Sequence, residues 1–499
     1  MNPLKIEEEG NIHTSETLLK SLTSDVSGYR ISKVLYILFF IHSAFLVMRF
    51  QDFPGMGWLG SIRVPGVFSL MMAVIGISFF FRFPQIRKVF FVLLVIPFIV
   101  FEAIRGVLGY TILQDWVLND AWQFSAWIVI VTYFLSFMIP IVTFMSSGKG
   151  LRLIAGALVF CGMLLGIYSI THSGFGPGGH IGDENDHCLF LVSLLPFPFF
   201  YMSYKRGFGF SRLLGLLSFF MIFFGAIRTN SRGGFLGLVA VLAVFFLVSK
   251  RKLLWIISAL VIALVSIPFI PDEYWGEVYS IKTDSTSKTG TMRERFDTWE
   301  IVYRMWRDPS NTVFGVGLEN TKWNTYLYEP DGAGFTKKSL AGRATHSFYF
   351  QVLGDLGLWG VFIYGALIIH SLRSLRKLYK LGSFLESRVL SLKIIPDING
   401  SQVGNVGESS KQDHTQLNRI RQILIGEARF LKGGAPALFS AWFGMLVSAL
   451  GISVAYYPSF WMYTALTASF YLYGERVKRF CMEFEKLIVK DVKKESRLV

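Results

Sequence analysis

Two arginines stand where one apolar run ends and the next begins, in the segment 228–234. Arg228 and Arg232 enclose a Thr-Asn-Ser triplet and precede two glycines. A guanidinium at a helix start is suited to bind an anion, because its donors and the helix N-terminus both attract negative charge. Paired glycines let another backbone or a ligand come close. An arginine at a helix end often only reaches for the membrane interface, but both lie on the side that the charge distribution below disfavours. We therefore predict that they bind an anion.

A second pair of arginines lies in the segment 291–299. Arg293 and Arg295 alternate there with Glu294 and Asp297. Taken alone, ion pairing on a helix surface explains such a pattern better than a functional role does.

A histidine opens a later apolar run, after a Gly-x-Gly segment at 315–317. Gly-x-Gly is a weak signal here, because no strand–helix unit for a dinucleotide surrounds it. His346 begins the segment 346–351. A lone histidine at an interface is usually satisfied by its neighbours, but a neutral histidine at pH 7 also suits a general base.

An acidic cluster precedes another apolar run, at 183–187. Asp183, Glu184 and Asp186 place three carboxylates within four residues. Such a cluster caps a helix, binds sugar hydroxyls or holds a divalent cation. No further ligand set accompanies it, so capping and sugar contact are favoured over a metal.

Membrane helices must position these segments. Of the 499 residues, 52% are hydrophobic and 17% charged, and the mean hydropathy is +0.47. A soluble protein of this length could not bury so much apolar surface, so a bilayer is the expected solvent. We predict an all-α polytopic membrane protein with about twelve transmembrane helices, from apolar runs of spanning length: 31–48, 64–82, 87–104, 121–145, 151–170, 187–204, 211–228, 233–249, 253–270, 346–370, 434–452 and 454–474.

The basic residues set the predicted orientation. The net charge is +15, and the cations form short clusters between apolar runs, which indicates topology control and contact with anionic membrane lipid; no nucleic-acid partner is expected. The clusters fall on one side of the predicted membrane, and the positive-inside rule makes that side cytoplasmic: Arg82, Arg87 and Lys88; Lys149 and Arg152; Lys205, Arg206 and Arg212; Lys250, Arg251 and Lys252; Arg373, Arg376, Lys377 and Lys380; Arg476, Lys478 and Arg479. The three cysteines suggest neither a disulfide framework nor a metal site.

The predicted organisation follows from these runs and charges. The loop 271–345 should be periplasmic and carry short amphipathic helices, one of them around 296–306. Within 371–433, a polar stretch rich in Ser, Gln and Asn around 401–418 indicates a solvated linker. The expected parts are a cytoplasmic N-terminal segment without a cleavable signal (1–30), helices 1–9 (31–270), the periplasmic loop (271–345), helix 10 (346–370), the cytoplasmic linker (371–433), helices 11–12 (434–474) and a basic cytoplasmic tail (475–499).

The order of these motifs resembles the O-antigen ligase/polymerase superfamily of bacterial membrane glycosyltransferases, over roughly 180–370. Asp183-x-Asn185-Asp186 is similar to a subgroup associated with exopolysaccharide loci, and Ser347 departs from the asparagine usual at that position. The motifs are Ser231-Arg232-Gly233-Gly234, Arg295 four residues before Trp299, Gly315-x-Gly317-x-x-Asn320, His346-Ser347-Phe348-Tyr349-x-Gln351 and Leu356-Gly357-Leu358-Trp359-Gly360.

The resemblance implies transfer of a glycan from a polyprenyl (undecaprenyl) diphosphate to an acceptor hydroxyl, at the periplasmic face of the bacterial inner membrane. Arg232 and Arg295, helped by Arg228, would stabilise the diphosphate leaving group. His346 would act as the base, with inversion at the anomeric carbon and without metal or cofactor. The partners would be a lipid-linked glycan donor and a glycolipid or glycan acceptor. Glycan or acceptor contacts are expected from Asp183, Asn185, Asp186, Asn320 and Gln351.

Two alternatives remain open from the sequence. A repeat-unit polymerase of O-antigen or exopolysaccharide would use the same site with a different acceptor. A polysaccharide or lipid transporter would place ionisable residues at mid-membrane and show inverted repeats, whereas Glu102 and Asp355 lie near the ends of their runs and no internal repeat is evident.

Overall fold

The computed structural model describes residues 33–82, 84–112, 120–204, 209–249, 291–329, 342–392 and 408–495, with isolated positions between 252 and 260. The predicted 1–30 segment, nearly all of the run 253–270 and the first part of the predicted loop, 271–290, lie outside these residues.

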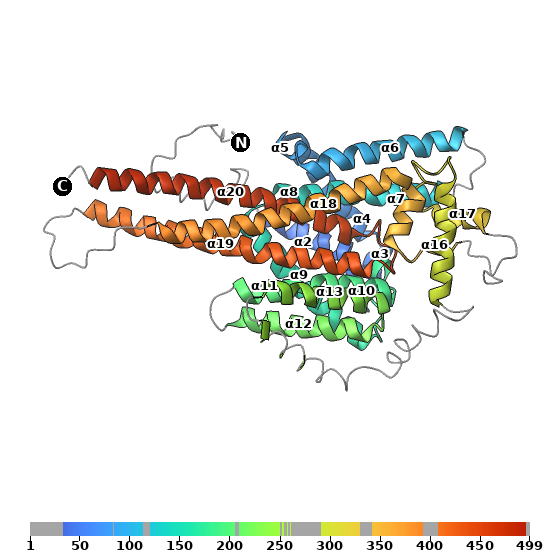
Figure 1. Cartoon of the computed structure of the whole chain (residues 1–499), viewed down its shortest axis with the longest axis horizontal. Helices are drawn as coiled ribbons and strands as arrows, with labels where there is room; N and C mark the ends of the chain where they lie inside the picture. Colours follow the sequence, from blue (N-terminus) through green and yellow to red (C-terminus); the bar gives the residue numbers. More distant parts are fainter. Residues whose placement is uncertain are drawn as a thin grey trace.

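The described residues are almost entirely helical and contain no strand, which confirms the all-α prediction (Figure 1). The first half of the chain forms α2 (Lys33–Val47), η1 (Phe50–Asp52), α3 (Gly57–Ser61), α4 (Val64–Arg82), α5 (Pro84–Arg87), α6 (Phe90–Ile112), α7 (Asp120–Tyr133), the π-helical η2 (Phe134–Met138), α8 (Ile139–Thr143), α9 (Gly148–Thr171), η3 (Gly179–Ile181), α10 (Glu184–Leu194), α11 (Pro196–Tyr204), α12 (Phe210–Arg228) and α13 (Arg232–Val248). The second half forms α16 (Thr291–Arg307), α17 (Thr321–Asn324), η5 (Thr325–Tyr328), α18 (Phe348–Ser391), α19 (Glu408–Ser448) and α20 (Pro458–Glu495).

Six of the described helical segments are long and apolar enough to cross a membrane. They are Val64–Arg82, Gln123–Thr143, Gly148–Thr171, Phe210–Arg228, Phe348–Ser391 and Thr415–Ser448. On α4, Val67, Leu70 and Phe81 are more than half exposed, as expected for a helix whose apolar side chains face lipid. The chain is a multi-pass membrane protein, and the number of twelve spans stays a prediction.

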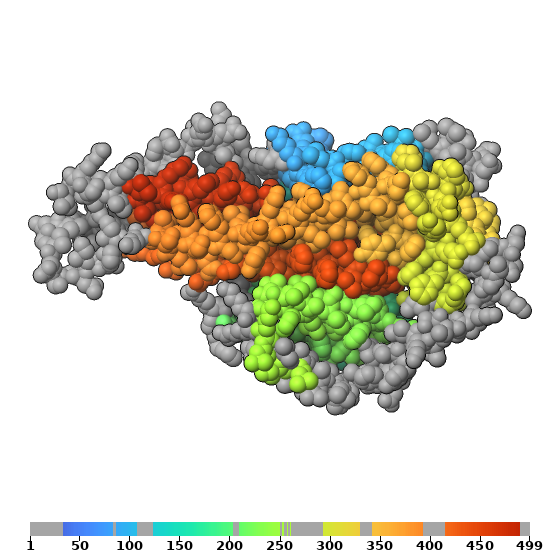
Figure 2. Space-filling view, viewed as in Figure 1, coloured from blue at the N-terminus to red at the C-terminus, as the bar shows by residue number. Residues whose placement is uncertain are grey.

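The long helices alternate in direction, so their ends lie at two opposite ends of the bundle (Figure 1). We name these the site end, which holds the candidate functional residues, and the stalk end. The site end holds the starts of α10, α13 and α18 and the turn between α19 and α20, and α16 lies across it as a cap (Figure 2). At the stalk end, α18, α19 and α20 continue past the other helices as a three-helix stalk. The 41 residues of α19 span about 60 Å, twice the hydrocarbon thickness of a bilayer, so this helix must leave the membrane.

The stalk replaces most of the solvated linker predicted at 371–433. Residues 371–391 and 408–433 are helical, and 393–407 lie outside the described residues. These two helical segments are polar overall, but apolar residues recur in them at helical spacing and pack between the helices. Composition alone does not reveal such a stripe. The buried residues are Leu375, Leu378, Leu385 and Val389 on α18 and Leu417, Ile420, Leu424 and Leu431 on α19.

The first part of α18 is held by hydrogen bonds to the segment 312–317, which form around a break in the helix at Gly357. Gly357 leaves helical geometry, with φ 58° and ψ −152°. The carbonyls of Gly354 and Asp355 accept hydrogen bonds from the amides of residues 316 and 317 (2.9 and 2.8 Å), and the amides of 358 and 359 donate to the carbonyls of 312 and 313 (3.0 and 2.9 Å). Inside a membrane protein, the backbone groups freed by a helix break need such partners. The Gly-x-Gly segment and the Leu-Gly-Leu-Trp-Gly motif are therefore one backbone unit.

The amphipathic helix predicted around 296–306 is α16, but of the residues whose spacing predicts its apolar face (Phe296, Trp299, Val302, Tyr303 and Trp306) Val302 alone is buried. Ile301, Val302 and Met305 are fully buried, whereas Phe296 and Tyr303 are 47% exposed. The helix packs against α18, so contact with the bundle, and not aromatic content alone, decides which side is covered.

Candidate active site

The turn between α12 and α13 joins the start of α10. Ser231 caps α13: its Oγ accepts from the amide of Gly234 (3.2 Å) and donates to Oδ1 of Asn185 (2.8 Å). Arg232 is the first residue of α13 and Arg228 the last of α12. The structure therefore brings the predicted anion-binding arginines to the same turn as the acidic cluster.

The glycines after Arg232 serve helix packing. A Cβ at Gly234 would lie 2.0 Å from Sγ of Cys188 on α10, and a Cβ at Gly237 would lie 1.9 Å from Oγ of Ser448 on α19. At Gly233, the first glycine of the predicted pair, a Cβ would lie 3.3 Å from the carbonyl oxygen of Ser448, so another backbone comes close there, and the approach of a ligand stays a prediction.

The two arginines of α16 have different surroundings. Arg293 forms an ion pair with Asp297 (2.9 Å), as the simpler reading predicted. Arg295 instead lies beside Gly451 in the turn between α19 and α20, where a glycine Cβ would be 3.2 Å from its guanidinium. Its charge lowers the pKa of His346, so Arg295 faces the site.

His346 sits in a constrained loop at the start of α18. Its φ of 48° is left-handed, a strained conformation for a residue other than glycine. On one side the indole of Trp299 donates to the carbonyl of Thr345 (2.9 Å), and on the other the amide of Phe348 donates to the carbonyl of Ala449 (3.0 Å). The backbone on both sides is thus held by α16 and by the α19–α20 turn.

The electrostatics of His346 combine both signs of charge. Partial burial of its ring lowers its pKa, Arg295 lowers the pKa further, and Asp183 opposes the shift. As a whole, the residue remains exposed. A histidine in this setting stays neutral at physiological pH and can accept a proton.

The acidic cluster lies at the start of α10, beside the α12–α13 turn. Asp183 caps α10 by accepting from the amide of Asn185 (2.8 Å), in agreement with the predicted capping. Oδ2 of Asp186 accepts from the hydroxyl of Tyr457 (2.8 Å). Burial raises the pKa of Asp186 to about 7, the Tyr457 hydrogen bond opposes that rise, and the neighbouring carboxylates add to it.

Asn320 and Gln351 lie behind the site. Asn320 is fully buried and donates to Oε1 of Gln123 (3.1 Å). Gln351 donates to Oε1 of Glu319 (3.2 Å) and accepts from the amide of Ala455 (3.2 Å). Both hold loops together in the structure, and their contact with a glycan stays a prediction.

Two further histidines, the buried His187 and the half-buried His180, lie near the acidic cluster. His187 is fully buried, with Nε2 3.3 Å from the carbonyl of Leu165. The ring of His180 lies 5.7 Å from the ring of Tyr457, next to Asp186. Among the described residues, no three His, Cys, Asp or Glu side chains gather as metal ligands.

The turn 449–457 contacts the candidate site, and no motif in the sequence marks it as part of that site. Ser453 bonds Thr345 (2.9 Å between hydroxyl oxygens), and the hydroxyl of Tyr456 donates to the buried Asp355 (2.8 Å). The predicted span 454–474 includes Tyr456-Tyr457-Pro458, whereas in the structure the two tyrosines belong to the turn and α20 begins at Pro458. This aromatic pair ahead of a proline is the signal that would have marked a turn.

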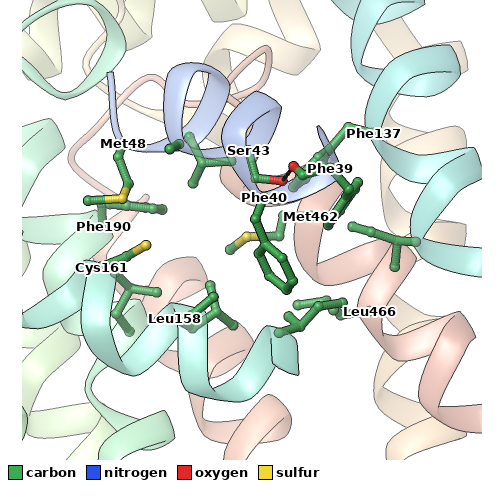
Figure 3. A pocket seen from close by; sticks show the side chains of 16 residues that line it. Phe39, Phe40, Ser43, Met48, Phe137, Leu158, Cys161, Phe190, Met462 and Leu466 are labelled. Atoms are coloured by element: carbon green, nitrogen blue, oxygen red, sulfur yellow. Dashed lines mark hydrogen bonds between the residues drawn. The ribbon is translucent and has the colours of Figure 1, made fainter. Parts of the chain in front are cut away.

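An apolar cavity of about 60 Å³ lies deeper in the bundle, between α2, α9, α10 and α20 (Figure 3). It reaches Phe190, one turn along α10 from Asp186. The hydroxyl of Ser43, its one polar side chain, donates to the carbonyl of Phe39 on its own helix (2.7 Å). The cavity therefore offers no group to a diphosphate or a sugar.

Comparison with known proteins identifies the central part of the chain. Residues 216–365 match the family model described as O-antigen ligase, and curated proteins yield no match. The matched region contains Arg228, Arg232, Arg295 and His346, but neither the acidic cluster nor the turn 449–457. The match confirms the resemblance stated from the sequence over residues 216–365 of this multi-pass membrane protein, which are similar to the O-antigen ligase family.

Proposed function

We propose that this protein moves a glycan from a polyprenyl diphosphate carrier to an acceptor hydroxyl at the site end. The family match supports a membrane enzyme of the O-antigen ligase or polymerase type. The observation that carries the proposal is the position of His346 between charges of opposite sign, with Arg295 and Asp183 both acting on its pKa.

The arginines have the chemistry that the donor needs. When the bond between the anomeric carbon and the phosphate oxygen breaks, negative charge develops on the lipid diphosphate, and fixed cations in a partly desolvated site stabilise it. Arg295 and Arg232, with Arg228 at the same turn, take this role, so that no metal ion is required. A guanidinium also binds a phosphate through two parallel hydrogen bonds.

The histidine has the chemistry that the acceptor needs. His346 removes the proton of the acceptor hydroxyl while its oxygen bonds to the anomeric carbon and the diphosphate leaves from the opposite face. This in-line displacement inverts the anomeric configuration. Because its pKa lies below the ordinary value, His346 is in the basic form at neutral pH.

The setting is the periplasmic face of a bacterial inner membrane, with a lipid-linked glycan as donor and a glycolipid or glycan as acceptor. A ligase and a repeat-unit polymerase would share this chemistry and differ only in the acceptor. Among the described cations, those at the end of α4 (Arg82), at the start of α9 (Lys149 and Arg152) and at the start of α12 (Arg212) lie at the helix ends opposite the site, which supports this orientation.

The first test separates the base from the diphosphate site. In a strain that lacks the native copy, we expect His346→Ala to reduce glycan transfer by about 10²–10⁴-fold while binding of undecaprenyl diphosphate to the protein persists. Arg232→Ala should lose both transfer and binding. Arg232→Lys should keep part of each, because lysine retains the charge but not the planar guanidinium that forms two parallel hydrogen bonds with a phosphate. Glycan gels and a lipid-diphosphate binding assay measure the two effects.

A matched control is available for the histidine. His172 also lies near the site end, is exposed and stacks on Tyr168 (3.9 Å between ring centres), and His172→Ala should transfer glycan normally. Normal transfer by His346→Ala would reject this residue as the base. Normal transfer by Arg232→Ala would reject the diphosphate site and favour the transporter alternative.

A further inference from the structure

The turn 449–457 touches the site from several sides although it lies outside the residues that match the family model. The carbonyl of Ala449 accepts from the amide of Phe348, and the hydroxyl of Ser453 bonds the side chain of Thr345, on either side of His346. Gly451 lies beside the guanidinium of Arg295. The last residue of the turn, Tyr457, reaches the acidic cluster. One short connection therefore joins the cationic side of the site to its carboxylate side.

The pair formed by Tyr457 and Asp186 has an open acceptor. The Tyr457 hydroxyl donates to Oδ2 of Asp186 (2.8 Å). Among the described residues, Oδ1 of Asp186 has no hydrogen-bond partner and is not a buried atom. Both side chains are half-buried, so one carboxylate oxygen is fixed by the protein and the other remains free for a ligand.

The charges around this pair favour a neutral hydroxyl as that ligand. Asp183 and Glu184 lie at the start of the same helix and disfavour an anion beside Asp186, and Arg232 lies at the neighbouring α12–α13 turn, one residue after the Ser231 that bonds Asn185. The His180 ring packs against the Tyr457 ring, and the charge of Glu319 also acts on Tyr457. A free carboxylate oxygen next to an aromatic ring is suited to a sugar, which offers hydroxyl donors and apolar C–H faces.

We propose that Tyr457 is a positioning residue of the glycosyl transfer site, which holds the Asp186 carboxylate so that its free oxygen accepts a hydrogen bond from a hydroxyl of the acceptor sugar. The inference rests on the proposed function and deepens it, because it assigns the carboxylate side of the site to the acceptor and brings the turn between α19 and α20 into substrate recognition.

The hydrogen bond has a consequence for pH dependence. Tyr457 stabilises the ionised form of Asp186 and thereby lowers its pKa, against the rise to about 7 caused by burial and by Asp183 and Glu184. Without the hydroxyl, the pKa of Asp186 rises further. Because the ionised carboxylate is the better acceptor, activity on the acidic side should be lost at a higher pH in the variant than in the native enzyme.

The experiment compares Tyr457→Phe with a matched tyrosine. The hydroxyl of Tyr463 on α20 donates to Oγ of Ser193 on α10, the helix that also carries Asp186 (2.8 Å). Initial rates are measured on the full-length protein in membranes over a range of pH. Lipid-linked donor and acceptor are both extracted from the parent strain, and the concentration of each is varied separately.

We expect Tyr457→Phe to raise the KM for acceptor about ten- to hundredfold, to leave the KM for donor unchanged and to move the acidic limb to higher pH. Asp186→Asn should raise the acceptor KM as well. Its rate should no longer fall with the protonation of residue 186, so the remaining fall on the acidic side of the pH–rate profile should come from protonation of His346 at lower pH. Tyr463→Phe should match the native enzyme in all three readouts.

Several outcomes overturn the inference. A change in kcat or protein amount alone, with the native acidic limb and acceptor KM, would make Tyr457 a structural residue, and a rise in donor KM would place the pair on the wrong substrate. If Tyr457→Phe does not accumulate, Asp186→Asn decides the acceptor assignment. Loss of transfer in His346→Ala together with a native Tyr457→Phe would reject this inference alone, whereas normal transfer in His346→Ala would reject the proposed function itself.

Discussion

The two ends of the helix bundle treat their charges differently. At the stalk end, charged side chains pair between helices: Glu386 on α18 contacts both Arg429 and Lys432 on α19 at 2.8 Å. At the site end, Arg293 pairs with Asp297 (2.9 Å) and Arg343 with Glu294 (2.6 Å), whereas the carboxylates of Asp183 and Asp186 accept hydrogen bonds from an amide and a hydroxyl, and among the described residues neither of these two forms an ion pair.

This difference separates a structural role from a chemical one. Ions that pair cancel each other's field and hold three helices in register. Carboxylates that form no ion pair among the described residues, such as Asp183 and Asp186, keep their field at the site, where a proton acceptor such as His346 can work on a substrate. The same residue types therefore serve assembly at one end and, in our proposal, catalysis at the other.

The largest test of this comparison is the placement of the two ends across the membrane. Ser310, before the Gly-x-Gly loop, and Ser387, in the stalk, are both exposed. An impermeant maleimide on intact spheroplasts should label Ser310→Cys and not Ser387→Cys, because the cation clusters place the stalk inside. The native protein, whose cysteines are Cys161, Cys188 and Cys481, gives the background. Labelling of Ser387→Cys without permeabilisation would put the site on the cytoplasmic side and contradict the proposed donor.

The second test compares the effect on glycan transfer of removing three arginines: two on α16 at the site end and one in the stalk. We expect Arg295→Ala to reduce transfer by about 10²–10³-fold, as the loss of a preorganised charge does. Arg293→Ala, on the same helix and ion-paired with Asp297, should stay near native activity. So should Arg388→Ala in the stalk, which is paired with Glu485. Glycan yield per amount of inserted protein is the measure, and equal losses in all three variants would show that arginine content, not position, matters.

The smallest expected effect concerns the stalk. Glu386→Gln removes the ion pairs with Arg429 and Lys432, whose side chains are 39% and 38% exposed. Such partly exposed pairs contribute at most about 1 kcal/mol each, so a small decrease in thermal stability in detergent is expected, with unchanged transfer. A loss of activity with normal stability would mean that the stalk acts on the site, and the comparison between the ends would fail.

Much of the helical framework could be predicted from the sequence, and its details could not. The apolar runs at 64–82 and 211–228 correspond closely to α4 and α12, because a spanning helix needs a continuous apolar stretch that is visible locally. The stalk was missed because its apolar stripe is diluted by polar faces. The covered side of α16 could not be predicted either, since its neighbours on α18 decide which residues are buried.

The candidate site shows the same limit. Arg295 and Arg293 have similar local sequence surroundings, and only the packing of α16 puts one of them beside the α19–α20 turn and the other in an ion pair. Gly315 and Gly357 were read as parts of separate motifs, and the structure joins them, since a Cβ at Gly357 would lie 2.6 Å from the amide nitrogen of Gly315.

The sequence by itself determined that the chain is helical, that a bilayer surrounds much of it and that arginines, carboxylates and a histidine stand at helix starts, because these properties follow from composition and local spacing. Only the tertiary structure decided which of these groups meet. Tyr457 and Asp186 are 271 positions apart, and no local pattern encodes a contact at that distance. Such a pair forms because the packing of α10 against α19 and the reversal of the chain at 449–457 bring the two side chains together, and that packing depends on the shape of the whole bundle.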